Sequence, residues 1–118
     1  PIKSSAASDV YKRPAYEEIT AMMQEIGLPC AYHHFAEGES PPPPFVVYLS
    51  PGEHTFHADN INYYSWKQLD VELYTDTKDP DAEQRVEDVL TAHEISYVKS
   101  ETWIESERLY EVLYEMEV

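Results

Sequence analysis

The sequence has few glycines, one cysteine and no long apolar run, and each shortage excludes a class of protein. Three glycines among 118 residues leave no glycine-rich loop to cradle a phosphate group. The single cysteine, Cys30, cannot form a disulfide within the chain, which fits a reducing cytoplasm. No apolar run approaches the roughly 18 residues that span a bilayer, so we expect a soluble protein with no membrane segment.

Positive charge is also scarce. Eight Lys and Arg residues against 23 Asp and Glu give a formal net charge of −15. Such a surface repels phosphate backbones and anionic membranes, which argues against nucleic-acid or membrane binding. Three interpretations stay open: an ordinary solvated surface, an interface with a basic partner, or a surface past which DNA moves without sticking.

Patterns typical of catalysis or metal binding are missing from the sequence. There is no Gly-x-Ser-x-Gly, and Cys30 has no patterned base beside it. His33 and His34 are neighbours in a predicted strand and should point to opposite faces, and His54 and His57 are three apart, the wrong parity for one face. No cysteine or carboxylate stands at a zinc-like spacing. We therefore expect no enzyme activity, no metal and no cofactor.

One enzymatic alternative is an N-terminal proline amine that acts as a general base, as in tautomerase-like enzymes. Pro1 is followed by Ile-Lys-Ser-Ser-Ala-Ala-Ser, which lacks the strand pattern that would hold such a base in a pocket. We regard this alternative as weak.

Apolar residues are plentiful enough for one folded domain. They make up 42% of the chain, and aromatic residues 13%, so burial can offset the ordering entropy of a single core. Residues 1–13 are polar and aperiodic, and we interpret them as a flexible or partner-ordered arm. Residues 14–118 form the predicted domain.

The pattern predicts two amphipathic helices. The first runs from Pro14 at its first position to Gly27 at its stop. The second begins with Asp79 as cap and Pro80 at the first helical position. Its predicted inner stripe consists of Ala82, Val86, Val89, Leu90 and His93.

The sequence pattern of the remaining residues predicts strands and loops. Strands are expected at residues 30–35, 45–49, 63–75, 96–104 and 108–118. Residues 53–62 are ambiguous, either a short strand with a turn at Asp59-Asn60 or an irregular excursion. The predicted fold is an α+β domain with a mainly antiparallel sheet and two helices packed on one face.

Alternation in two strands places acidic residues on one side of each. In residues 68–73, Asp70 and Glu72 point away from the apolar set. In the last strand, Glu111, Glu115 and Glu117 do the same. We expect one of these acidic faces to line a surface shared between subunits, although a solvated face is the ordinary alternative.

Two further segments are candidate contacts with neighbouring subunits or partners. Four prolines, Pro41, Pro42, Pro43 and Pro44, predict a stiff polyproline II arm in an exposed loop, with Phe45 as its anchor. The excursion that holds His54, Phe56 and His57 is the second candidate. Either segment is equally consistent with a spacer that has no binding role.

Several phrases of the sequence are similar to one known family. ELYTDTKDP (residues 72–80), LYEVLYE (residues 109–115) and AYHHFAEGES (residues 31–40) resemble phrases in tail-terminator or tail-completion proteins of long-tailed bacteriophages that infect Gram-positive bacteria. The resemblance covers about residues 20–118 and includes no catalytic residue.

The resemblance implies a structural virion protein at the head–tail junction. Such proteins are α+β subunits of rings, typically hexamers, that cap the finished tail tube and present a surface to the head connector. The expected partners are further copies of the chain, the major tail tube protein and the connector or stopper, with DNA passing through unbound. The alternatives are another connector protein, of the stopper or head-completion kind, or an acidic DNA-mimic inhibitor.

Overall fold

Two helices and six strands make up the described part of the chain. The computed structural model describes residues 14–58 and 61–118, and only the backbone for 53–58 and 61–66. The predicted arm (1–13) and the turn at Asp59-Asn60 lie outside the described residues. The elements in chain order are α2 (Tyr16–Gln24), β1 (Cys30–Tyr32), β2 (Phe45–Leu49), β3 (Glu53–Ala58), β4 (Ile61–Thr75), α3 (Pro80–Ala92), β5 (Tyr97–Ile104) and β6 (Leu109–Glu117).

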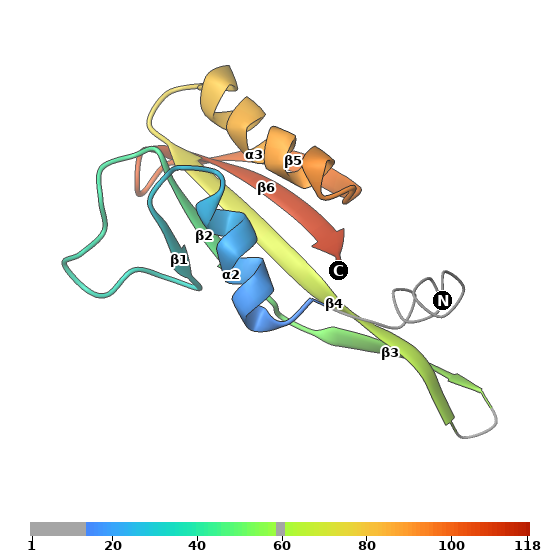
Figure 1. Cartoon of the computed structure of the whole chain (residues 1–118). Helices are drawn as coiled ribbons and strands as arrows, with labels where there is room; N and C mark the ends of the chain where they lie inside the picture. Colours follow the sequence, from blue (N-terminus) through green and yellow to red (C-terminus); the bar gives the residue numbers. More distant parts are fainter. Residues whose placement is uncertain (1–13, 59–60) are drawn as a thin grey trace.

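Five strands form the main sheet, in the order β1-β2-β4-β6-β5 (Figure 1). Only β1 and β2 run parallel; the other pairs are antiparallel. The long strand β4 pairs with β2 and β6 through residues 68–75, and with β3 through residues 61–67. The predicted α+β class is confirmed.

Both helices pack on one face of the sheet, as expected from the sequence (Figure 1). Alternate residues of the central strands point to them, because successive side chains of a strand point to opposite faces. Register partners such as Leu73 and Val112, or Val71 and Tyr114, therefore lie side by side in the core. The sheet residues that belong to the core cluster under the helices are Val46, Tyr48, Leu69, Val71, Leu73, Val112, Tyr114 and Met116.

Helix α2 ends where glycine permits it. Gly27 has φ +81°, a left-handed conformation that costs glycine little and other residues more. The Arg85 side chain of α3 donates from Nε to the Ile26 carbonyl (3.1 Å) and from Nη2 to the Gly27 carbonyl (3.0 Å). The end of α2 is thereby tied to α3. At the other end α2 begins at Tyr16, so Pro14 precedes the helix by two residues rather than opening it.

Helix α3 begins as predicted, at Pro80 with Asp79 as cap. The Ala82 N–H donates to the Asp79 carboxylate over 3.1 Å. The prediction for His93 is wrong: this residue follows the helix, and its side chain is 39% exposed. Glu83, in the first turn of α3, is buried although the pattern did not place it in the inner stripe; it is 5% exposed.

The hairpin of β3 and β4 projects from the body of the domain (Figure 1). The radius of gyration is 16.3 Å, whereas a compact domain of about 100 residues has one of roughly 13 Å. The sequence left residues 53–62 open between a short strand with a turn and an irregular excursion. The structure has a strand there, β3.

Candidate assembly face

The sheet face turned away from the helices carries acidic side chains without basic ones. It is built from alternate residues of β2, β4, β6 and β5, which the register brings into rows. Alternate residues of four segments point to this face: 45–49, 68–74, 98–104 and 109–117. Five of these residues are acidic, and none is Lys or Arg. The acids are Asp70, Glu72, Glu111, Glu115 and Glu117. The two acidic faces considered separately in the sequence are therefore one surface, which we call the open face.

Like charges stand directly opposite each other on the open face. Asp70 is the register partner of Glu115. Residues opposed in this way have Cβ atoms about 4.5–5.5 Å apart, and like charges there are destabilising. The arrangement lowers the stability of the isolated chain, and residues that break a stability rule in this way are typical of functional sites.

Tyr74 connects two of these carboxylates. Its hydroxyl donates to Glu72 Oε1 (2.8 Å) and lies 3.2 Å from Glu111 Oε2. Burial raises the pKa of Glu72, and the charges of Glu111 and Asp70 raise it further, against the opposing effect of the Tyr74 hydrogen bond. Burial and the same two glutamates also raise the pKa of Tyr74, which keeps its proton available as a donor.

We expect Glu72→Gln to stabilise the protein at pH values above the raised pKa of Glu72. A carboxyl group whose pKa is raised by folding binds more protons when folded than when unfolded. Stability therefore falls as the pH rises from the ordinary value of 4.5 through the raised pKa. The glutamine keeps an oxygen for Tyr74 and removes the charge, so a gain of about 0.2–1 kcal/mol is expected, the range for cross-strand pairs.

Urea unfolding at a series of pH values checks this prediction. Glu117→Gln is the matched control, because it removes one charge from the exposed end of the same face and leaves the Tyr74 contacts intact. Equal pH profiles for the two variants would contradict the role given to Glu72.

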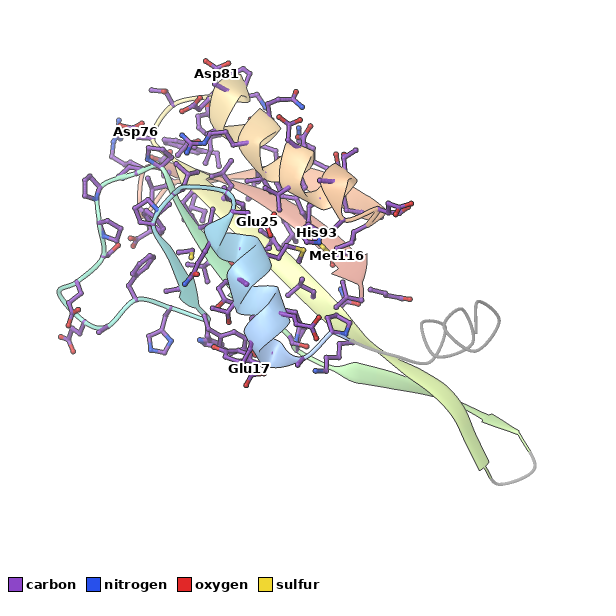
Figure 2. The ribbon with its side chains drawn as sticks, in the orientation of Figure 1. Glu17, Glu25, Asp76, Asp81, His93 and Met116 are labelled. Atoms are coloured by element: carbon purple, nitrogen blue, oxygen red, sulfur yellow. The ribbon has the colours of Figure 1, made fainter. Side chains whose placement is uncertain are left out.

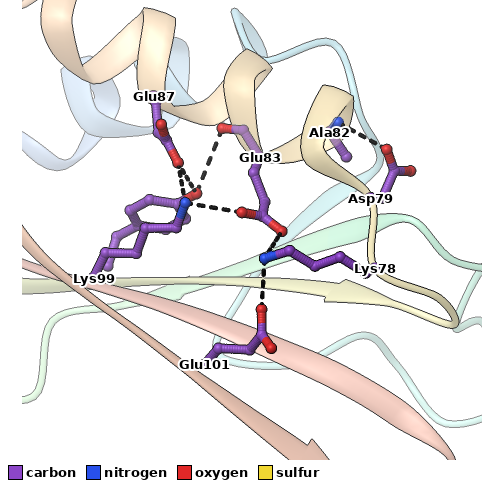
Figure 3. A network of polar contacts seen from close by, with 8 residues as sticks. Lys78, Asp79, Ala82, Glu83, Glu87, Lys99 and Glu101 are labelled. Atoms are coloured by element: carbon purple, nitrogen blue, oxygen red, sulfur yellow. Dashed lines mark hydrogen bonds and ion pairs between the residues drawn. The ribbon is translucent and has the colours of Figure 1, made fainter.

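Two lysines, Lys78 and Lys99, lie on the helix side instead, next to α3 (Figure 3). The buried Glu83 carboxylate is held by Lys78 (2.7 Å) and Lys99 (2.8 Å). Lys99 also contacts Glu87 (2.6 Å), and Lys78 contacts Glu101 (2.7 Å). These ion pairs fasten α3 to β5 and leave the open face uncompensated.

Hydrogen bonding decides the charge state of Glu83. Burial alone would raise its pKa, but the hydrogen bonds from Lys78 and Lys99 together outweigh burial, and the pKa is lowered. The Tyr114 hydroxyl adds a 2.8 Å hydrogen bond to Glu87. Sequence reasoning missed this network, because no local pattern relates α3 to β5 across the sheet.

Apolar side chains complete the open face. Val98 is 66% exposed, and Leu113 and Ile104 are half-buried. Neither α2 nor α3 covers them, because both described helices pack on the other face of the sheet (Figure 1). The face thus combines exposed apolar groups with uncompensated acids, a composition that fits a partner with both apolar and basic residues.

The proline segment differs from its prediction. Residues 36–44 form the expected loop, but the chain bends at residues 42–44, so Pro41 to Pro44 do not form one straight polyproline II arm. Phe45 is only 8% exposed. Its ring packs against those of Phe35 (5.4 Å) and Tyr74 (5.3 Å between centroids). Phe45 is therefore part of the subunit's own packing and not a free anchor.

The histidine pairs are placed differently from the prediction. The strand expected at 30–35 stops at Tyr32, because His33 has φ +67°. The turn brings His33 Nδ1 within 3.0 Å of His34 Nδ1, so the two rings meet and do not point to opposite faces. His54, Phe56 and His57 lie in β3, whose register shifts after Phe56; their side chains lie outside the described residues.

Catalytic chemistry has little support in residues 14–52 and 67–118. Burial raises the pKa of the Cys30 thiol, which disfavours the reactive thiolate. Within these residues no group of three or more His, Cys, Asp or Glu side chains is placed to hold a metal ion. Pro1 lies outside the described residues.

A groove of about 680 Å³ lies between the start of α2 and the end of α3. Apolar side chains of α2 and β6, among them Ile19, Met22 and Met116, line it. His93 Nε2 and Glu25 Oε1 are 3.1 Å apart and link the two helices beside it, where Figure 2 shows the two side chains between the ribbons.

No protein-family model and no curated protein sequence matches the chain. Neither of the described helices is long and apolar enough to cross a membrane.

Proposed function

We propose that this chain is a structural subunit of the head–tail junction of a long-tailed bacteriophage. In this role it forms a ring, as a hexamer, that caps the completed tail tube and joins it to the head connector. The open face is the surface through which the subunit meets a basic or mixed partner surface. No catalytic step is part of this function.

The observation that carries the proposal is where the family-like phrases fall. ELYTDTKDP begins in β4 and LYEVLYE lies in β6, and these two strands are neighbours in the sheet. Together they supply Glu72, Tyr74, Glu111 and Glu115, four of the polar residues of the open face. Two of the three phrases that resemble tail terminators thus lie in the strands that supply the acids of the open face.

Charge supports the same function. A net charge of −15 repels DNA, so a ring of such subunits lets DNA pass its lumen without binding it. An acidic face also steers the approach of a basic partner and makes association sensitive to salt.

Negative-stain electron microscopy of the protein mixed with tail tubes of the same phage tests the proposal. We expect rings, or density that caps one end of the tubes. Reversing the open face (Glu111→Lys, Glu115→Lys and Glu117→Lys together) should abolish capping, because it places three positive charges where the partner meets negative ones.

A second triple variant controls for net charge. Glu17→Lys, Asp76→Lys and Glu107→Lys change the charge by the same amount at exposed positions away from the open face, two of which Figure 2 labels. This variant should still cap the tubes.

Failure of the wild-type protein to form rings or to bind tubes would contradict the proposal. Tight, salt-sensitive binding to a nuclease would then favour a DNA-mimic inhibitor, and binding to the head connector alone would favour a stopper.

A further inference from the structure

Strand β5 leaves a long edge of the sheet unpaired. It is the last strand in the sheet order, and its eight residues pair with β6 on one side only. No described strand occupies the other side. A free edge of this length presents a row of backbone N–H and C=O groups to any strand that approaches.

The usual protections of an edge strand are missing from β5. It contains no proline, and its register with β6 advances without a bulge from Tyr97 to Ile104. Its two charged residues, Lys99 and Glu101, are engaged on the helix side by Glu83, Glu87 and Lys78. Its residues on the open face are uncharged: Val98, Ser100, Thr102 and Ile104. An edge of this kind is suited to strand addition.

Strand β3 provides a second free edge on the opposite side of the molecule. β2 and β3 follow one another along the same side of β4, and β6 and β5 lie on its other side. No described strand pairs with the outer side of β3, which belongs to the projecting hairpin (Figure 1). Its sequence, Glu53-His-Thr-Phe-His-Ala58, has a single acid, so it can approach another copy of this acidic chain with little charge repulsion.

We propose that β3 of one copy of the chain pairs with the β5 edge of a second copy and extends its sheet. Because the two edges lie on opposite sides of the subunit, the contact is head-to-tail, and such contacts generate rings when the rotation closes. A symmetric contact between two β5 strands would leave β3 unpaired. This inference deepens the proposed ring by assigning its subunit contact, and it is tested separately from tail binding.

Two variants each remove one half of the contact. Ser100→Lys with Thr102→Lys places charges on the β5 edge at exposed positions, the protection that natural edge strands use. The second variant replaces residues 53–67 by Asn-Gly. The Gln68 N–H donates to the Gly52 carbonyl over 3.0 Å, so this hydrogen-bonded pair can close a two-residue turn once the projecting hairpin is removed.

Sedimentation velocity over a series of concentrations measures the outcome. The wild-type protein should self-associate, and each variant alone should stay a monomer. An equimolar mixture should form a 1:1 dimer and nothing larger, because only one intact edge meets one intact hairpin. The mixed dimer also shows that both variants are folded.

Several results would overturn the inference: a wild-type protein that is monomeric at every concentration, a hairpin-deleted variant that still self-associates through β5 alone, or a mixture that stays monomeric. The proposed function fails independently of these. Self-association by this contact without capping of tail tubes would contradict the phage role and leave the contact standing.

Discussion

Leu73→Ala is expected to lower the free energy of unfolding by roughly 2–5 kcal/mol, the range for a leucine deleted from a well-packed core. Leu73 lies on β4 between Val46 and Val112 and is fully buried under the helices. Removal of its side chain leaves a cavity that the surrounding strands cannot close, because the sheet holds them at fixed spacing. Urea unfolding followed by circular dichroism measures the loss.

Leu113→Ala is the matched control for this prediction. It makes the same chemical change on the neighbouring strand, at a half-buried position on the open face. Neither described helix lies above Leu113, so its side chain buries less apolar area and the loss should stay below about 1.5 kcal/mol. Equal losses for the two variants would mean that the open face is covered in the free protein.

Gly27→Ala is expected to cost roughly 2–3 kcal/mol, from left-handed backbone strain and from lost hydrogen bonds to a charged group. Gly27 has φ +81°, and a Cβ atom at this position would collide with the guanidinium of Arg85. Arg85 must then give up its bonds to the Ile26 and Gly27 carbonyls, so the link between α2 and α3 loosens.

Gly38→Ala separates the two causes. Gly38 has a similar φ of +78°, but nothing lies within 4 Å of the added Cβ. The free energy of unfolding of this variant should fall only by the cost of left-handed backbone strain, about 1–2 kcal/mol. Thermal or urea unfolding measures both variants. Equal losses in the free energy of unfolding would mean that the collision with Arg85 does not destabilise the protein.

Local patterns predicted the elements whose signals are local. The cap at Asp79, the proline after it and the stop at Gly27 depend on a few neighbouring residues, and the structure has them where the pattern placed them. Alternation in β4 and β6 likewise predicted which side chains enter the core. The prediction failed where contacts between distant segments decide the outcome, as at Phe45, which packs against Phe35 and Tyr74.

The sequence by itself determined the helices, most strands, the α+β class and the acidic balance, because capping, alternation and composition act over a few residues or over the whole chain. Only the tertiary structure decided that the acids of β4 and β6 share one face, since strand order and register are set by pairing between segments far apart. It also decided that Glu83 is buried between Lys78 and Lys99 and that β5 is the edge strand of the described sheet. Those relations depend on how the helices cover one face of the sheet, which no local pattern specifies.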